Sequence, residues 1–235
     1  MNSRRTYADS CGIARALDIV GERWALLVVR ELVLGPKRFT DLRAGLPRAG
    51  PDMLAARLRE LEAAGVVRRR TLPAPAASRV YELTEWGAEL APALLALGRW
   101  GSRAPLPPAA PPLGIDAAIM ALETTFAPAD RQDPPGPLAV GLGDQVFTLT
   151  VDAAGGLVVT RGAQGGAPAR IDTETATLAA VVWHGHPLQA AIDDGTLALT
   201  GDRALADAWL AAFAAPVPVP WPVPVPVPAP VPVSR

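Results

Sequence analysis

The chain has 235 residues, a formal net charge of −1 and one cysteine, so it is long enough for two modest domains but cannot form an internal disulfide. No apolar run reaches the roughly 18 to 20 residues that span a bilayer, because Arg30 and Glu31 interrupt the longest candidate. Residues 1–11 contain basic side chains but no hydrophobic segment of a secretory signal, so we expect a cytoplasmic protein with no membrane partner.

Two helices are predicted before residue 35. Apolar residues recur every three or four positions over about Gly12 to Val20, as they do in an amphipathic helix. The segment Trp24–Leu34 is apolar on nearly every side, which is typical of a central, buried helix. Gly35 and Pro36 then end this helix.

The stretch from Phe39 to Ala64 predicts two short amphipathic helices joined by the turn LPRAGP. Pro51 suits the first position of the second helix, because its missing N–H would have no partner there. Two helices that meet in this way form a helix-turn-helix, whose second helix can lie in a DNA major groove. A helical hairpin inside an ordinary core would have the same periodicity, so both interpretations remain open here.

A β-hairpin is predicted directly after these helices, from strand-like runs at Val66–Leu72 and Val80–Leu83. The loop of about residues 73–79 between them contains two prolines, which cannot serve a central ladder. A helix-turn-helix followed by a hairpin is a winged helix. Arginine runs are often solvated faces, but these lie where a wing would meet the backbone of a duplex.

The predicted DNA-binding residues lie on the second helix, around the first helix and at the base of the wing. The face of the second helix is expected to contact bases through Asp52, Ala55, Ala56 and Arg59, with Arg57 on its flank. The first helix and the turn before it contribute Lys37, Arg38, Thr40 and Arg43. The wing contributes Arg68, Arg69, Arg70 and Arg79.

Charge is distributed unevenly along the chain. Residues 1–103 contain 17 Lys or Arg against 11 Asp or Glu, whereas residues 104–235 contain 5 against 12. A basic first half favours a phosphate-facing module, joined here to a part that avoids DNA. Solvation alone can produce a difference of this size, so the asymmetry supports this interpretation without deciding it.

A long helix is predicted from about Glu85 to Trp100, with an apolar stripe at helical spacing. A winged helix of about 100 residues has little core left to cover that stripe. We therefore expect it to pack against the same helix of a second subunit, assisted by the first helix of the chain. Trp100 could instead face the second domain, and the sequence does not separate these alternatives.

Residues 9–103 resemble the HxlR family of bacterial winged-helix transcriptional regulators. The motifs that carry the resemblance are the cysteine near the start, GERW, LGPKRF, RLRELEAAG and LTEWG, in the order and spacing of the family. The resemblance implies a homodimeric DNA-binding regulator, expected to be a repressor, whose two recognition helices lie about 34–36 Å apart on a pseudo-palindromic operator.

Two positions depart from that family's pattern. Gly50 replaces the usual Ser at the start of the recognition helix, and Asp52 follows the proline. Glycine still caps a helix tolerably, but Asp52 would repel phosphate unless it accepts a hydrogen bond from a cytosine amino group. These changes leave the fold in place and put the details of DNA readout in doubt.

Cys11 is a candidate redox sensor, because it lies just before the first helix and near Arg4, Arg5 and Arg15. A thiol at a helix N-terminus beside arginines can react with oxidants or electrophiles. Some HxlR-like regulators sense such compounds through the cysteine at this position, whereas others have it with no known sensing role. Sensing and packing both remain open for Cys11.

Residues 104–114 contain five prolines and predict a semi-rigid linker. Residues 115–214 then predict a second α+β domain, in which helices pack on a small antiparallel sheet, so the fold class of the whole chain is α+β. The expected strands are Leu138–Leu142, Val146–Val151, Leu157–Thr160 and one in GTLALTGD. A helix is expected to open at Thr173–Thr175 after a polar turn.

The closing segments of this domain resemble the sterol-carrier-protein fold in their order and in the strand GTLALTGD. The resemblance implies an apolar tunnel for a small hydrophobic effector, which we hypothesise alters how the two DNA-reading heads are spaced. A sealed core uses the same residue types, so the pattern does not separate core from tunnel. The candidate lining residues are Ile119, Leu122, Phe126, Val182, Trp183, Leu188, Trp209 and Phe213.

No cofactor, metal site or enzyme activity is predicted. His184 and His186 lack a cysteine or carboxylate at ligand spacing, and no nucleophile elbow or phosphate loop is present. From Pro216 to Pro232 every second residue is proline, which predicts an extended polyproline-II tail, either disordered or docked in an aromatic groove. The alternative to a regulator is a lipid-binding carrier whose winged helix only mediates dimerisation.

Overall fold

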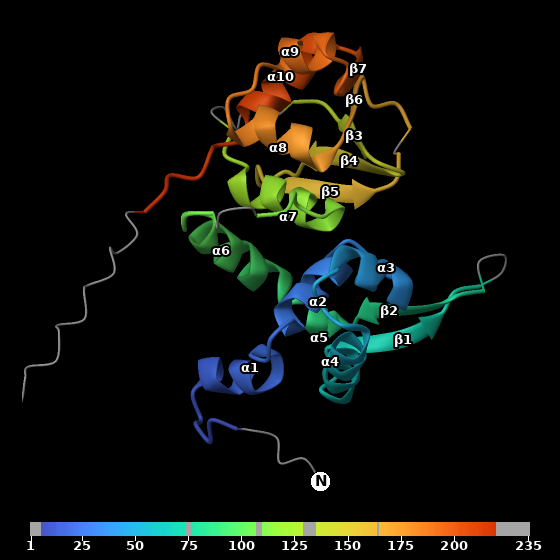
Figure 1. Cartoon of the computed structure of the whole chain (residues 1–235), viewed down its shortest axis with the longest axis vertical. Helices are drawn as coiled ribbons and strands as arrows, with labels where there is room; N and C mark the ends of the chain where they lie inside the picture. The colour runs from blue at the N-terminus through green and yellow to red at the C-terminus, as the bar shows by residue number, and fades with distance from the viewer. Residues whose placement is uncertain (1–5, 74–76, 107–109, 129–134, 164, 220–235) are drawn as a thin grey trace, which may run out of the picture.

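The computed structural model describes residues 6–73, 77–106, 110–128, 135–163 and 165–219. Two bodies are stacked along the long axis of the molecule, with α6 and α7 lying where they meet (Figure 1). The N-terminal body holds the first six helices and a two-stranded hairpin, and the C-terminal body is built on a five-stranded sheet. The α+β fold class with an N-terminal helix-turn-helix is confirmed.

The N-terminal body begins with four helices at the predicted positions: α1 (Gly12–Val20), α2 (Ala25–Val33), α3 (Phe39–Gly45) and α4 (Pro51–Ala63). Helix α4 ends because Gly65 adopts a φ of 76°, which lets the Val66 N–H donate to the Leu61 carbonyl over 2.9 Å. The apolar faces of α2, α3 and α4 close one core around Val28, Val29, Leu32, Leu42, Leu54, Leu58 and Leu61.

The predicted hairpin is present as β1 (Val67–Thr71) and β2 (Arg79–Leu83), which pair antiparallel. Residues 74–76 of the wing loop lie outside the described residues. A third segment joins the hairpin, because Lys37 and Tyr81 exchange two backbone hydrogen bonds of 2.8 and 2.9 Å. The wing is therefore fixed to the segment that leads into α3.

The single long helix predicted over residues 85–100 is wrong. The chain forms a short helix, α5 (Glu85–Ala88), and a separate one, α6 (Ala91–Gly101). Pro92 explains the break, since it has no N–H to donate and its ring would clash with the carbonyl four residues earlier, at Ala88. The apolar stripe is therefore divided between two helices.

The C-terminal body opens with α7 (Ile115–Thr125) and contains the predicted strands as β3 (Leu138–Leu142), β4 (Gln145–Val151), β5 (Leu157–Arg161) and β7 (Leu197–Gly201). The structure adds a further strand, β6 (Ala169–Thr173), where the sequence pattern predicts a polar turn. The sheet order is β5-β4-β3-β6-β7, and β3 pairs parallel to β6. The sheet is thus mixed, which corrects the antiparallel prediction.

Helices α8 (Thr175–Trp183), α9 (Leu188–Asp193) and α10 (Arg203–Ala211) complete this body. The core lies between the helices and one sheet face, where alternate residues such as Leu138, Val140 and Leu142 are buried. Trp209 lies fully buried in that core, and its Nε1 donates to the Gly136 carbonyl over 2.8 Å. The polar atom of the indole is therefore satisfied inside an apolar cluster.

Among the described helices, none is both long and apolar enough to cross a bilayer. The prediction of a polyproline-II tail falls mainly on residues 220–235, which lie outside the described residues. The preceding residues lie against the end of α6, where the Val219 N–H donates to the Arg103 carbonyl over 2.9 Å. Arg103 Nε in turn donates to the Val217 carbonyl over 3.2 Å.

Candidate nucleic-acid interface

One face of α4 is open to solvent and carries most of the predicted base-contacting residues. Asp52 and Arg59 are exposed, and Ala55 and Ala56 between them are half-buried. These four positions follow the spacing of three and four residues that places side chains on one helix face. Met53, which the prediction did not include, is also exposed on α4.

Arg57 does not lie on this face, and the expectation that it reads bases from the flank is wrong. Its side chain is 7% exposed and forms ion pairs with Glu60 on α4 and with Glu22, the latter at 3.8 Å. Its Nε is buried without a hydrogen-bond partner among the described residues. Arg57 therefore secures α4 to the turn before α2, and its charge is not free for DNA.

The predicted residues of α3 are arranged beside α4. Arg38, Thr40 and Arg43 are all exposed. The Arg38 N–H donates to the Asp41 carboxylate over 3.1 Å, which satisfies a free N–H at the start of α3. Arg48, in the turn between α3 and α4, is exposed as well. Sequence reasoning missed Arg48, although a basic residue inside the predicted turn was available as a signal.

Lys37 was predicted to neutralise phosphate, and the structure contradicts this. Its side chain is 10% exposed, and its Nζ lies 2.7 Å from Glu31 Oε2 and 2.5 Å from Asp116 Oδ2. A lysine held between two buried carboxylates cannot reach a DNA backbone. No local pattern predicts this pair, because Asp116 lies 79 positions further along the chain.

The wing holds its four arginines at the surface. Arg68 and Arg70 both pair with Glu82, at 2.7 and 3.1 Å. Arg69 pairs with Glu62 on α4 at 3.1 Å, and its guanidinium carbon lies 5.4 Å from the centre of the Tyr81 ring. Arg79 is also exposed. Because two glutamates face four arginines, the wing keeps a net positive charge at neutral pH.

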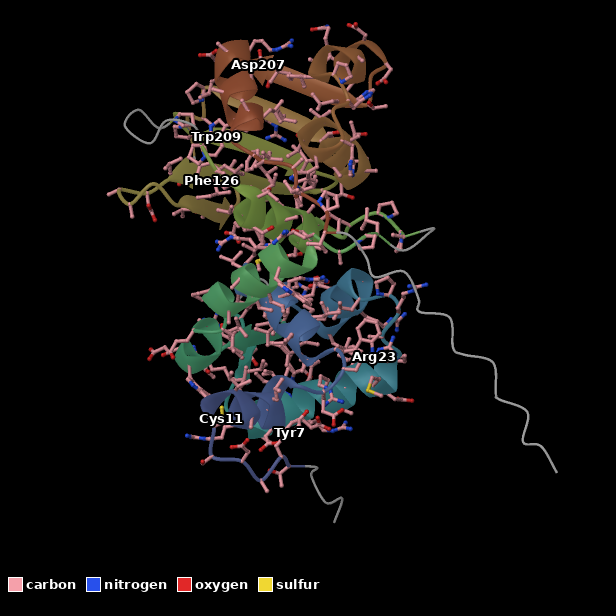
Figure 2. All side chains as sticks on the ribbon, turned by 90° about the vertical axis from the view of Figure 1, so that its left-hand side faces the viewer. Tyr7, Cys11, Arg23, Phe126, Asp207 and Trp209 are labelled. Atoms are coloured by element: carbon pink, nitrogen blue, oxygen red, sulfur yellow. The ribbon has the colours of Figure 1, made fainter. Side chains whose placement is uncertain are left out.

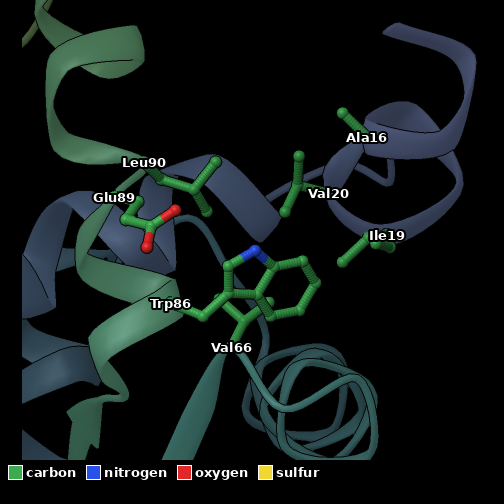
Figure 3. Close-up of a pocket in the computed structure, with 7 residues that line it drawn as sticks. All are labelled: Ala16, Ile19, Val20, Val66, Trp86, Glu89 and Leu90. Carbon is green, nitrogen blue, oxygen red and sulfur yellow. The ribbon is translucent and has the colours of Figure 1, made fainter. Parts of the chain in front are cut away.

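An apolar groove lies between α1 and α5. Its volume is about 210 Å³. The Trp86 indole forms its floor beside Val66, with Ile19 and Val20 of α1 across from it (Figure 3). Nearby side chains are unusually open, since Ile13 is 73% exposed and Trp86 is 50% exposed. Large apolar side chains that are exposed to solvent mark a surface suited to binding a protein partner.

Cys11 occupies the N-cap position of α1 without a side-chain cap hydrogen bond, and the described residues do not pack over its side chain. Its N–H donates to the Asp9 carboxylate over 2.8 Å. Arg4 and Arg5, expected to lie near the thiol, fall outside the described residues. Cys11 lies at the end of the molecule far from Phe126 and Trp209 (Figure 2).

The eight candidate tunnel residues gather in one cluster of the C-terminal body. They pack against one another, as the ring centres of Phe126, Trp209 and Phe213 lie 5.8 to 6.3 Å apart. Two other hollows on this body are lined instead by polar and small residues around Asp172 and Thr148. In the structure the eight residues thus form a close-packed core, and the tunnel stays a prediction.

Within the described residues, no group of three His, Cys, Asp or Glu side chains is placed to hold a metal ion. His184 is exposed just after α8, and His186 is half-buried two residues later. Their own backbone N–H groups both donate to the Ala180 carbonyl, at 3.1 and 3.0 Å. These histidines therefore lie in the segment that ends α8.

Comparison with known proteins places this surface in a family. The sequence profile of the HxlR-like helix-turn-helix family matches residues 19–106. YvaP, an HTH-type transcriptional regulator of Bacillus subtilis, is 39% identical over 88 residues, which are 37% of this chain and 82% of YvaP. YdeP of the same organism is 35% identical over 95 residues, which are 40% of this chain and 74% of YdeP.

A solved structure with similarity is the reduced form of the transcriptional regulator YodB from B. subtilis. It is 33% identical and has a TM-score of 0.37, covering 40% of this chain and 94% of the YodB chain. Residues 107–235, which include the mixed sheet, lie outside the family match. Through residues 19–106, this chain belongs to the HxlR-like helix-turn-helix family of transcriptional regulators.

Proposed function

We propose that this protein regulates transcription by inserting α4 into the major groove of a specific operator. The observation that carries the proposal is the open α4 face of Asp52, Ala55 and Arg59, flanked by exposed arginines of α3 and the wing. On this geometry α4 contacts base edges. The flanking cations contact phosphates and hold the helix in register. They are Arg38, Arg43, Arg48, Arg68, Arg69, Arg70 and Arg79. Compared with the residues predicted from sequence, this set includes Arg48 and no longer includes Lys37 and Arg57.

The regulator acts as a homodimer in this proposal. The apolar groove between α1 and α5, together with the exposed Ile13 and Trp86, gives a second copy an apolar surface to bury. A two-fold dimer presents two copies of α4, which matches a pseudo-palindromic operator with half-sites one helical turn apart. In sedimentation, Ile13→Asp should therefore reduce the dimer to a monomer, whereas Ala208→Asp, at an exposed position on α10 of the C-terminal body, should not. A wild-type monomer at micromolar concentration would contradict this part of the proposal.

Fluorescence anisotropy with a labelled duplex from the DNA upstream of the gene tests the proposal. We expect affinity for that duplex at least 1000-fold higher than for a scrambled duplex, in line with specific operators. Affinity should also fall steeply between about 50 and 200 mM salt, because bound cations release counterions. Equal, weak binding to both duplexes would reject a sequence-specific regulator and favour a carrier whose winged helix only dimerises.

For the C-terminal body we propose a sterol-carrier-like fold that senses a small hydrophobic effector. In support, α7 is followed by three antiparallel strands, then by β6, α8, α9, β7 and α10, and the core holds three clustered aromatic rings. Because the core is closed, an effector has to open it, and should then change tryptophan emission from Trp209. Titration with fatty acids and sterols that leaves emission and melting temperature unchanged would reject the effector.

Control through Cys11 is a separate proposal. It is supported by the exposure of the thiol at the start of α1, the helix that forms one wall of the apolar groove. Diamide should release the wild-type protein from DNA but leave the Cys11→Ser variant bound. Equal release of both proteins would reject the idea. Because Cys11 is the sole cysteine, any disulfide formed by diamide joins two chains and is visible on a non-reducing gel.

A further inference from the structure

A row of five alternating charges crosses the boundary between the two bodies. Arg30 pairs with Glu31 at 2.7 Å, and Glu31 pairs with Lys37 at 2.7 Å. Lys37 then pairs with Asp116 on α7 at 2.5 Å, and Asp116 pairs with Arg161 on β5 at 2.5 Å. Glu31 and Asp116 are only 1% and 3% exposed. Such charges have little solvent to compensate them, so each depends on its neighbours in the row.

Lys37 links this row to the wing through its backbone. Its N–H donates to the Tyr81 carbonyl over 2.9 Å, and the Tyr81 N–H donates to the Lys37 carbonyl over 2.8 Å. Tyr81 belongs to β2 and pairs across the hairpin with Arg69 of β1. Ion pairs that restrain the Lys37 side chain therefore also restrain Tyr81, at the base of the wing. Helix α3 begins only two residues later, at Phe39.

Glu31 extends the same row to the end of α3. A methyl group added at Gly45 would collide with the Glu31 carboxylate, so the last turn of α3 lies directly on that charge. A side chain at this position would have to displace the Glu31 carboxylate. Two of the elements in the candidate DNA interface, α3 and the wing, thus rest on neighbouring members of the row.

Asp116 is the member contributed by the C-terminal body that both bodies share. One of its oxygens accepts from Lys37 and the other from Arg161. Arg161 also reaches back to the N-terminal body, where its Nε donates to the Leu34 carbonyl at the end of α2 over 3.3 Å. In addition, the Arg161 guanidinium carbon lies 4.9 Å from the centre of the Phe147 ring, inside the sheet of its own body. Asp116 and Arg161 therefore form a clasp with residues from both sides.

We propose that Asp116 is a positioning residue for the DNA-binding surface. Acting through Lys37, the C-terminal body holds the wing and α3 in the arrangement that binds DNA. The part of the inference that concerns DNA rests on the proposed function, whereas the part that concerns the wing applies to the free protein. A ligand or partner that shifts α7 against the N-terminal body then changes DNA affinity without touching DNA.

Amide hydrogen exchange of the full chain, followed by NMR, tests the mechanical part. In Asp116→Asn, exchange at Lys37 and Tyr81 should be at least 10-fold faster than in wild type, with the β3 and β4 amides unchanged. Asp207→Asn is the matched control, since it removes a carboxylate from an exposed i,i+4 pair with Arg203 on α10, and it should leave Lys37 and Tyr81 unchanged. Unchanged exchange at the wing, or equal acceleration in both bodies, overturns the proposal.

A second variant covers the case in which Asp116→Asn does not fold. Lys37→Met combined with Asp116→Leu removes both charges of the link, and Glu31 keeps its pair with Arg30. The double variant should fold, and its Tyr81 amide should exchange at least 10-fold faster than in wild type, because the ion pair between Lys37 and Asp116 is lost. Wild-type exchange at Tyr81 in this double variant overturns the proposal.

Binding to the operator duplex completes the test. Asp116→Asn should weaken binding about 5- to 10-fold and leave the slope of log affinity against log salt unchanged, because it removes no phosphate contact. Undiminished affinity, or a smaller slope, overturns the DNA part of the inference. If the wild type binds no duplex, the proposed function fails, and the exchange experiment still decides whether Asp116 positions the wing.

Discussion

At the scale of single residues, burial separates side chains that the sequence treats alike. Arg57 and Arg59 are the same residue type two positions apart on α4, which is roughly 200° around a helix. Arg57 is buried and paired with Glu22 and Glu60, whereas Arg59 is exposed on the open face. One arginine therefore contributes to the structure and the other is available to contact DNA.

We expect Arg59→Ala to reduce discrimination at one base pair of the operator by about 1–3 kcal/mol, because a bidentate contact to a base edge is lost. Arg57→Ala should leave base preference as in wild type and alter thermal stability instead. Competition binding with duplexes substituted at each position measures both variants. If Arg57→Ala changes base preference and Arg59→Ala does not, the orientation assigned to α4 is wrong.

Glu123 on α7 gives a pH-dependent prediction. Burial raises the pKa of its carboxyl from 4.5 to about 7, since desolvation disfavours the charged form. The folded state therefore binds a proton more tightly than the unfolded state, and the free energy of unfolding falls as pH rises from about 4.5 through about 7. At pH 8 the half-buried Glu123 carboxyl is charged in the folded protein, and the free energy of unfolding is lowered by the full cost of that buried charge.

Glu123→Gln should then stabilise the protein by about 2 kcal/mol at pH 8 and by much less at pH 4.5, because the amide carries no charge at either pH. Thermal melts at the two pH values measure this difference. Glu174→Gln is the control, since Glu174 is exposed and its substitution should change little at either pH. Equal stabilisation of the Glu123 variant at both pH values would show that its charge is not the cause.

At the scale of elements, the helix-turn-helix and the wing followed from local patterns. Amphipathic spacing, Pro51 and Gly65 together fixed the ends of α3, α4 and β1 to within about a residue of the structure. Strand β6 was missed because its five residues, ARIDT, alternate charged and apolar side chains too briefly to stand out from a turn. The apolar spacing continues across Pro92, so it predicts one helix although Pro92 itself favours a break there.

Ion-paired positions could not have been found in this way. The roles of Lys37 and Arg57 depend on Asp116 and Glu22, which no local periodicity connects to them. Burial of a charge is decided by partners from distant parts of the chain, so the local pattern predicted a DNA contact for Lys37 and for Arg57 although both are buried. The predicted site was therefore too inclusive at these two positions and lacked Arg48.

The end of α4 provides a prediction for an element. Gly65 has a φ of 76°, which costs a side chain about 1 kcal/mol or more, so Gly65→Ala should lower the stability of the N-terminal body by at least that amount. Gly101→Ala, at the end of α6, has free space and an ordinary φ, and should be neutral or slightly stabilising. Urea denaturation compares the two variants. Equal effects would mean that the Gly65 turn does not constrain the chain.

At the scale of the whole molecule, a family helix-turn-helix is joined to a second body by a buried clasp of charges. The open α4 face lies on the N-terminal body, and the clasp at Asp116 connects α3 and the wing to the mixed sheet. Helix α1, which forms one wall of the apolar groove, lies at the end of the molecule opposite the C-terminal body (Figure 1). The DNA binding, dimerisation and control by the second body that we propose thus use different surfaces of the chain.

The central claim is that α4 reads bases in the major groove, and methylation interference on the operator tests it most directly. Methylation of guanine N7, which lies in the major groove, should abolish binding at two clusters of positions about one helical turn, 10–10.5 base pairs, apart. Methylation of adenine N3 in the minor groove should have no effect within those clusters. Binding that is insensitive to N7 methylation throughout the site would contradict the account.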